Sequence, residues 1–221
     1  MTELLSMTPQ DQDLLFREAR TANAFTDEPV SEEQVRAIYD LVKWAPTALN
    51  AQPLRVLLVP QGEARERLLQ HMAPGNREKT ASAPLVAVLA ADVDFHEQLP
   101  RVFPHFAGAR DSFAADERGR VETARFNAAL QAGYFLLGVR AAGLAAGPMG
   151  GYDADGIDAD LLAGTGWRSV LVVNLGHPAQ NAWRDRLPRL DFDEVVRTLS
   201  VEPAADATEA VGADSLQRQA A

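Results

Sequence analysis

The segment PTALNAQP, residues 46–53, is the part of the sequence from which fold and function are most readily inferred. Before it, the capping-box pattern SEEQ at 31–34 and apolar residues at helical spacing from Val35 to Val42 predict a helix that ends before the segment. After it, RVLLV at 55–59 predicts a strand. The segment is therefore a polar loop between a helix and a strand, where ligand-binding side chains often lie, although a simple turn is the alternative.

Helical and strand patterns alternate along the rest of the chain. The other predicted strands cover residues 85–90 and 169–175, and the other predicted helices begin near residues 8, 63, 123 and 191. The first of these is expected to run from Thr8, as N-cap, to about Ala19. The mixture predicts a single α+β domain over residues 1–200. Residues 201–221 are rich in Ala, Asp and Glu without periodicity, so a disordered acidic tail is expected there.

The longest predicted helix, residues 123–142, is apolar around most of its circumference. One face carries Phe126, Leu130, Tyr134, Leu137 and Ala141. The helix is also rich in Ala and Gly, which lets other backbones approach it closely, and Gly143 is a natural C-cap. Such a helix is expected in a domain core or at an interface.

Composition restricts the class of function. The net charge of −10 disfavours nucleic acid and anionic membrane surfaces as partners, because phosphate neutralisation needs clustered Lys and Arg. The absence of cysteine excludes disulfides, thiolate nucleophiles and cysteine metal sites, and the four histidines are not at metal-ligand spacing. These residues give no reason to expect a metal. Neither a signal peptide nor a membrane span is apparent, so a soluble cytoplasmic protein is expected.

Two glycine-containing motifs imitate nucleotide-binding patterns and are rejected. GTGWRS at 164–169 precedes a predicted strand, whereas a dinucleotide fingerprint follows one. GNREKT at 75–80 lacks the second glycine of a phosphate loop. Neither motif therefore predicts a nucleotide site.

Four polar or glycine-rich segments lie between the regular elements: RTANAF at 20–25, PTALNAQP at 46–53, GPMGGYD at 147–153 and RDRLP at 184–188. Taken singly, each has a simpler explanation. Arg20 can be a cation at a helix end, and Gly150-Gly151 can be a tight connection. The order and combination of the four segments favour a shared ligand-binding role.

That order resembles the nitroreductase family of flavoproteins. In this family an R-[ST]-x-[KRN]-x-[FW] segment, a P-[ST]-x-x-N-x-Q-P loop, a glycine turn and a C-terminal basic pair surround FMN. The resemblance covers about residues 12–199. Within the family, the chain most resembles the RutE/HadB subgroup of NADH dehydrogenase-like proteins. This subgroup includes the malonic semialdehyde reductase of pyrimidine breakdown. This narrower likeness rests on KWAPT at 43–47, LP at 99–100, FPH at 103–105, GPM at 147–149 and RLPRL at 186–190.

The resemblance implies a nitroreductase-like fold, with a central, mostly antiparallel sheet wrapped by helices, and a homodimer with intertwined termini. It also implies an oxidoreductase with FMN as cofactor and NADH or NADPH as reductant. Hydride would pass through N5 of the flavin to a small-molecule acceptor. Because the flavin carries the chemistry, no catalytic side chain is expected.

The needs of FMN assign roles to individual residues. Because the protein is acidic, the FMN phosphate needs cations and hydrogen-bond donors nearby. The expected cations are Arg20, Arg184 and Arg186, and Thr21 adds a hydroxyl donor. Its pyrimidine edge matches amide side chains and one cation, which are Asn23, Asn76 and Lys79. A surface lysine at a helix end explains Lys79 equally well.

The remaining expected cofactor contacts surround the flavin ring. Gly150 and Gly151 would let the backbone approach the ring and direct an N–H at N5. The other lining residues, in part from the neighbouring subunit, are Pro46, Thr47, Ala48, Asn50, Pro148 and Met149. Two departures from the family pattern leave the redox tuning open. Many relatives have Lys or Arg in place of Asn23, and some have an acidic residue before the second glycine.

Turnover is expected to be ping-pong, with NAD(P)H and the acceptor using the same space in turn. Residues 94–120 are expected to form a lid and an acceptor wall that includes Phe103, Phe106 and Phe113, although a packed helical insertion explains them equally well. Candidate acceptors are nitroaromatics, quinones, activated alkenes and aldehydes of the 3-oxopropanoate type. The rival functions are a flavin carrier without reductase turnover and a helical interaction module.

Overall fold

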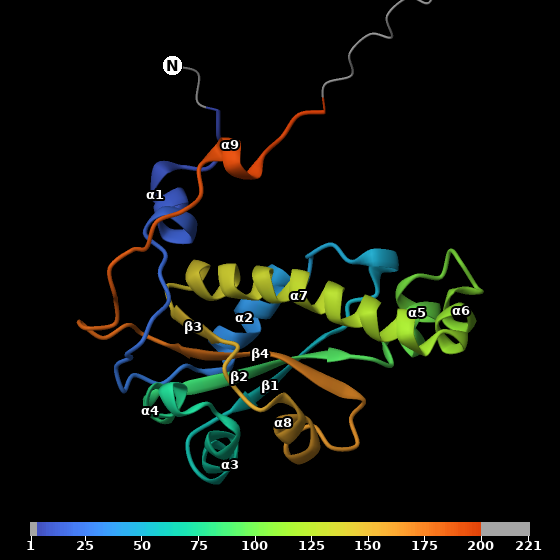
Figure 1. Ribbon diagram of the computed structural model, residues 1–221, viewed down its shortest axis with the longest axis horizontal. Helices are drawn as coiled ribbons and strands as arrows, with labels where there is room; N and C mark the ends of the chain where they lie inside the picture. Colours follow the sequence, from blue (N-terminus) through green and yellow to red (C-terminus); the bar gives the residue numbers. More distant parts are fainter. Residues whose placement is uncertain (1–3, 200–221) are drawn as a thin grey trace, which may run out of the picture. The chain divides into compact units, whose positions relative to one another are not determined.

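A single four-stranded sheet forms the centre of the computed structural model, which describes residues 4–199 (Figure 1). The strand order is β1-β2-β4-β3, and every pair of neighbours is antiparallel. The strands are β1 (Leu54–Val59), β2 (Leu85–Asp92), β3 (Ala145–Met149) and β4 (Trp167–Gly176). The predicted α+β fold with a mostly antiparallel sheet is confirmed.

Strand β2 is buried at every position because helices cover both faces of the sheet. Side chains of a strand alternate between its faces. Leu85, Ala87 and Leu89 accordingly belong to one core cluster, and Val86, Val88 and Ala90 to the other. A register shift between Leu89 and Ala90 marks an irregularity in the pairing of β2 with β4.

The helices divide between these two faces (Figure 1). On one face lie α2 (Glu32–Val42) and the 25-residue α7 (Glu117–Ala141), which pack against each other and against the first cluster. On the other lie α3 (Glu63–His71), α4 (Pro74–Ser82) and α8 (Ala154–Asp160). The predicted capping box of Ser31 and Gln34 is present at the start of α2.

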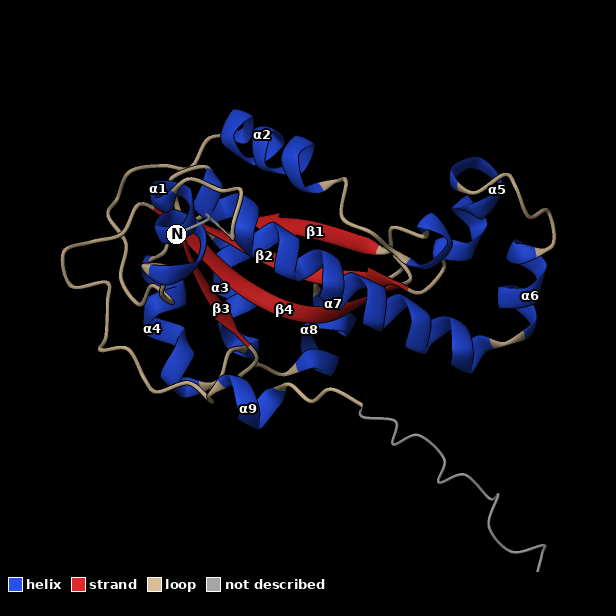
Figure 2. Ribbon diagram, turned by 90° about the horizontal axis from the view of Figure 1, so that it is seen from above, coloured by secondary structure: helices blue, strands red, loops and turns tan. Residues whose placement is uncertain are grey.

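A third apolar cluster lies at one end of the sheet, where η3 (Phe95–Gln98), α5 (Leu99–Val102) and α6 (Ala109–Ala115) pack against the first half of α7. Figure 2 shows α5 and α6 at the end of the molecule opposite to α4. The centre of this cluster is the fully buried Phe95.

Helix α7 buries several small residues together with Phe135 and Val139, and it exposes other large apolar side chains. Its buried side includes Ala124, Ala128 and Gly138, and a Cβ added to Gly138 would lie 2.3 Å from Val42 Cγ1 of α2. Phe126 is 67 % exposed, and Leu130 and Tyr134 are also exposed. The helix therefore serves the core of one chain while it presents an apolar face to its surroundings.

Three local predictions are corrected by the structure. The first helix does not continue as an α-helix to Ala19: α1 (Pro9–Gln12), capped by Thr8, passes into the π-helical η1 (Asp13–Arg17). Helix α4 has no predicted counterpart, because PGNREKTAS shows no apolar periodicity. GPM at 147–149, expected as a glycine turn, belongs to β3, where the pairing with β4 overrides the low strand propensity of Gly and Pro.

The chain divides after Asp185 into a large unit and a C-terminal unit. The second unit contains α9 (Phe192–Val195), which begins where the sequence predicts, and Glu194 Oε2 accepts from Asp191 N–H at 2.7 Å. The disordered tail expected for residues 201–221 lies outside the described residues, so the domain boundaries stay a prediction. No helix within residues 4–199 is long and apolar enough to cross a bilayer.

Candidate functional site

The segment that begins with Arg20 is held against the start of β3. Ala22 N–H donates to Ala146 O at 3.0 Å, and Asn23 N–H donates to Ala182 O at 2.9 Å. Arg20 Nη1 donates to Arg184 O at 3.4 Å. The backbone thus brings the first and the last of the predicted site segments together, although they are far apart in the sequence.

Lys79 joins this neighbourhood from α4. Burial and the nearby charge of Arg184 lower the pKa of Lys79 below its ordinary value. Among residues 4–199, no carboxylate forms an ion pair with Lys79 or Arg184, and Arg20 has only a distant, solvent-exposed pairing with Glu18 at 4.0 Å. We call Arg20, Lys79 and Arg184 the cationic group. Positive charges placed together without counter-charges favour the binding of an anion.

Two buried polar side chains outside the predicted site hold α4 in place. Arg65, 1 % exposed, donates to Thr80 O at 2.7 Å, Ala83 O at 2.8 Å and Val59 O at 2.7 Å, and burial lowers its pKa to about 10. Asn174, fully buried in β4, donates to Lys79 O at 3.0 Å. The sequence offers one signal for Asn174, which is a lone amide inside an apolar strand.

A side chain is excluded at Gly147 by the backbone of the Arg20 segment, whereas one at Gly151 would have to displace the end of the Asn76 side chain. A Cβ on Gly147 would lie 2.7 Å from Ala22 O, and a Cβ on Gly151 would lie 2.8 Å from Asn76 Nδ2. Gly150 is open to solvent, and no described residue accepts a hydrogen bond from the N–H of Gly150 or Gly151. These two donors remain available to a ligand.

Several predicted contacts are engaged within the chain itself. Asn76 Nδ2 donates to Gly151 O at 2.9 Å, and Asn23 Nδ2 donates to Thr21 O at 3.2 Å. Met149 is buried, and its sulfur accepts from Thr80 Oγ1 at 3.6 Å, so its side chain lies in the core. Pro148 is half-buried and Thr21 is exposed. Arg186 belongs to the C-terminal unit.

Loop 46–52 adopts a left-handed backbone at three residues that are not glycine. The φ angles are 51° at Leu49, 50° at Asn50 and 45° at Gln52. Bulky L-residues rarely adopt this region, and such conformations concentrate at functional sites. The loop includes the short η2 (Ala48–Asn50), and Gln52 N–H donates to Thr47 Oγ1 at 3.1 Å. Pro46, Ala48 and Asn50 are exposed.

Loop 46–52 is tied to α7 and α5 by side-chain amides. Asn127 Oδ1 accepts from Ala48 N–H at 2.8 Å, and one turn later Gln131 Oε1 accepts from Leu54 N–H at 2.9 Å. Asn50 Nδ2 donates to Val102 O at 2.9 Å. Neither Asn127 nor Gln131 is among the site residues expected from the sequence. Two amides four residues apart among the buried positions of an apolar helix are the signal that could have found them.

The three predicted wall residues differ in position. Phe113 packs edge-to-face on Phe95, with ring centroids 5.1 Å apart, so it is part of the third apolar cluster. Phe103 is half-buried and meets His105 edge-to-face at 5.6 Å. Phe106 is 54 % exposed, and it is the one of the three that most readily meets a ligand.

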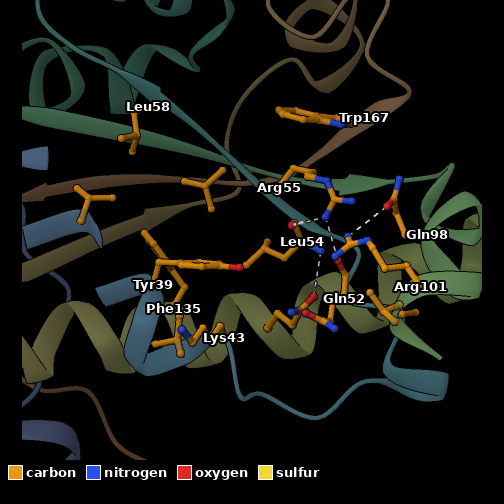
Figure 3. A pocket seen from close by; sticks show the side chains of 16 residues that line it. Tyr39, Lys43, Gln52, Leu54, Arg55, Leu58, Gln98, Arg101, Phe135 and Trp167 are labelled. Carbon is orange, nitrogen blue, oxygen red and sulfur yellow. Dashed lines mark hydrogen bonds between the residues drawn. The ribbon is translucent and has the colours of Figure 1, made fainter. Parts of the chain in front are cut away.

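A cavity of about 490 Å³ runs along the outer edge of β1, between α2 and α7 (Figure 3). Tyr39, Lys43, Arg55, Arg101 and Trp167 are among its lining residues. Arg55 also pairs with Asp92 at 2.6 Å. None of the predicted site residues lines this cavity.

The two groups of site residues are separated along α7. Loop 46–52 meets the helix at Asn127, whereas the segment of Arg20 meets the chain at Ala146, beyond the helix end. From Asn127 to Ala141 the helix rises by about 21 Å. Figures 1 and 2 likewise show α5 and α4 towards opposite ends of the sheet.

Comparison with known proteins identifies the family. The sequence model described as the nitroreductase family matches residues 16–177. The chain belongs to the nitroreductase family. This nitroreductase-family chain is 62 % identical over 195 residues to a protein of Streptomyces griseus, provisionally named NADH dehydrogenase/NAD(P)H nitroreductase; the match covers 88 % of this chain and 99 % of the relative.

Two further comparisons support the family assignment and the fold. A protein of Leptothrix cholodnii with the same provisional name is 51 % identical over 199 residues, which cover 90 % of this chain and 100 % of the relative. A crystal structure from Exiguobacterium sibiricum, described provisionally as a nitroreductase in complex with FMN, superposes with a TM-score of 0.73 at 17 % identity. It covers 87 % of this chain and 99 % of that one. At this identity, the likeness shows the fold alone.

Proposed function

We propose that the protein is an FMN-dependent oxidoreductase that takes hydride from NADH or NADPH, and that it works as a cytoplasmic homodimer. The names of the relatives and the FMN in the structural neighbour support this proposal. The observation that carries it is the cationic group of Arg20, Lys79 and Arg184, whose one ion pair among residues 4–199 is the exposed contact of Arg20 with Glu18 at 4.0 Å.

The residues of this group fit FMN. Arg20, Thr21, Arg184 and Arg186 would bind the phosphate dianion through charge-assisted hydrogen bonds. Lys79 would stabilise negative charge on the pyrimidine side, and a glycine N–H at Gly150 or Gly151 would donate to the ring. Asn23 and Asn76 would bind the pyrimidine edge through Oδ1 and the second amide N–H, because only one N–H of each is used, on Thr21 O and Gly151 O.

A second copy of the chain would complete the site. The exposed Pro46, Ala48 and Asn50 lie far along α7 from the cationic group, so we propose that they line the FMN bound to the partner. Phe126, Leu130 and Tyr134 form an exposed apolar face on the same helix, as a dimer interface would require. The C-terminal unit exposes Leu187, Leu190, Phe192, Val195 and Leu199, which fits intertwined termini.

Bound FMN would supply the capacity to accept and to donate hydride at N5. The chain's own residues would bind and orient this group and leave one face of the ring open. Residues 94–120 would form the wall of that open space, with Phe106 as its exposed aromatic side chain. Because reductant and acceptor would use this one space in turn, we propose ping-pong turnover.

The acceptor is proposed only by class. Nitroaromatics, quinones and activated alkenes fit a flat apolar wall. An aldehyde of the 3-oxopropanoate type would follow if the chain belongs to the RutE/HadB subgroup. A flavin carrier without turnover is the alternative function.

Anaerobic titration of the purified protein tests the proposal. We expect a yellow protein whose FMN absorbance bleaches on addition of NADH or NADPH and returns when an acceptor is added. Bound FMN that neither nucleotide bleaches would support the carrier instead. A colourless protein that does not bind added FMN at micromolar concentration would contradict both functions.

A further inference from the structure

Asn127 is a buried amide of α7, 2 % exposed, and both ends of its side chain are used. Its Oδ1 accepts from Ala48 N–H at 2.8 Å, and its Nδ2 donates to Thr123 O, one turn earlier in the helix, at 2.9 Å. The second bond fixes the orientation of the amide: Nδ2 must face the carbonyl oxygen of Thr123, so Oδ1 faces the N–H of Ala48. The amide is therefore a rigid acceptor that faces the first residue of η2.

The position of this bond coincides with the strained part of the loop. Leu49 and Asn50, directly after Ala48, have φ angles of 51° and 50°. Without external contacts, non-glycine residues leave this conformation readily. Three anchors oppose that tendency: the bond from Ala48 to Asn127, the bond from Asn50 to Val102, and the packing of Leu49 in the third apolar cluster.

We propose that Asn127 is a positioning residue, which holds loop 46–52 in its left-handed form so that the loop is ready to line FMN. This inference rests on the proposed function. Asn127 does not act on FMN itself: it binds the backbone of the loop, and the loop residues would make the contact. Loss of Asn127 would therefore leave the lining residues unchanged, but only two of the three anchors would hold their left-handed conformation.

Gln131 provides a matched control. It is also a buried amide of α7, 7 % exposed, and it also accepts from a backbone N–H, at 2.9 Å. Its partner, however, is Leu54 at the start of β1, which lies in an ordinary strand. Asn127→Leu and Gln131→Leu each remove one such bond, but only the first of them releases loop 46–52.

The experiment compares wild type, Asn127→Leu and Gln131→Leu. Amide hydrogen exchange by NMR reports whether the Ala48 N–H is protected, and fluorescence titration gives the dissociation constant of FMN. We expect Asn127→Leu to lose protection at Ala48 and to bind FMN about tenfold more weakly, as the loss of one buried hydrogen bond implies. Gln131→Leu is expected to change FMN affinity by less than about twofold. Equal melting temperatures of the two variants would show that this difference does not come from a general loss of stability.

The outcomes separate the inference from the function on which it rests. If the wild type binds FMN and the two variants bind it equally well, the inference about Asn127 is wrong while the function stands. If the wild type binds no FMN, the function fails, and the cofactor part of the inference fails with it. Asn127→Asp is the variant to use if Asn127→Leu does not fold. Its carboxylate keeps an acceptor for Ala48 N–H but loses the bond to Thr123 O that orients the amide, so protection at Ala48 and FMN affinity should fall together. A variant that loses this protection and still binds FMN like the wild type would overturn the inference.

Discussion

Asn50 donates a hydrogen bond of 2.9 Å to the carbonyl oxygen of Val102, the last residue of α5. The bond joins the proposed cofactor-lining loop to the segment that leads into Phe103. Leu49 packs in the same apolar cluster as Val102 and Phe103, so a movement of the loop reaches the proposed acceptor wall through this bond and through that packing.

Substitution of Asn50 tests this connection. Asn50→Ala and Asn50→Gly both remove the bond to Val102, so both are expected to raise KM for the acceptor more than KM for the nucleotide. They differ in backbone cost, because glycine tolerates a φ of 50° and alanine does not. We expect Asn50→Ala to be less stable than Asn50→Gly by about 1 kcal/mol in urea unfolding. Equal stability would show that the loop relaxes out of the left-handed region.

Lys79 should give FMN binding a dependence on alkaline pH. Burial and Arg184 place the pKa of Lys79 below its ordinary value of 10.5 in the free protein. A bound anion favours the charged amine, so the affinity is complete below this lowered pKa and falls as the pH rises through it. FMN titrations from about pH 8 to pH 10 check this. Lys79→Met should bind FMN more weakly and lack this alkaline decrease, and an identical decrease in the variant would exclude Lys79 as its cause.

Gly147 should not tolerate a side chain. Its Cβ would meet Ala22 O at 2.7 Å, and backbone cannot move aside as cheaply as a side chain. Gly147→Ala is expected to lower the free energy of unfolding by about 1–3 kcal/mol and to weaken FMN binding through displacement of the segment of Arg20. Gly75→Ala is the control, because a Cβ there meets nothing within 4 Å and lies within helix α4. The control should be neutral or stabilising by up to about 1 kcal/mol.

The exposed face of α7 should govern assembly. Leu130→Glu places a charge among Phe126 and Tyr134, so we expect sedimentation velocity to show monomers at concentrations where the wild type is a dimer. FMN should be lost at the same time, because the monomer would lack the partner's loop. Glu122→Gln, a change on an exposed side chain of the same helix, is the control. A Leu130→Glu protein that stays dimeric would place the interface elsewhere.

The parts of the fold that the sequence predicts correctly are those with strong local patterns. Strands β2 and β4 contain unbroken apolar runs, and α2 begins at a complete capping box. Helix α4 and strand β3 lack such patterns. Tertiary contacts stabilise them instead, through the bonds of Arg65 to the end of α4 and the ladder between β3 and β4.

The candidate site shows the same limit. The segments at 20–25 and 147–151 could be found because their residue types suit a dianion and a close backbone approach, and the structure brings them together at Ala22 and Gly147. Asn127 could not be connected with loop 46–52, because the two are far apart in the sequence. The left-handed backbone was also hidden, since Leu49 is not a residue that favours it.

The distance between the cationic group and loop 46–52 along α7 has a genetic consequence. A cell that carries one allele with Lys79→Met and another with a damaged loop would produce mixed dimers. In each mixed dimer, one site would combine the intact cationic group of the loop-damaged subunit with the intact loop of the Lys79→Met subunit. The other site would carry both defects. Two alleles that each impair both sites of their own homodimer are therefore expected to complement each other, which a protein with a self-contained site does not do.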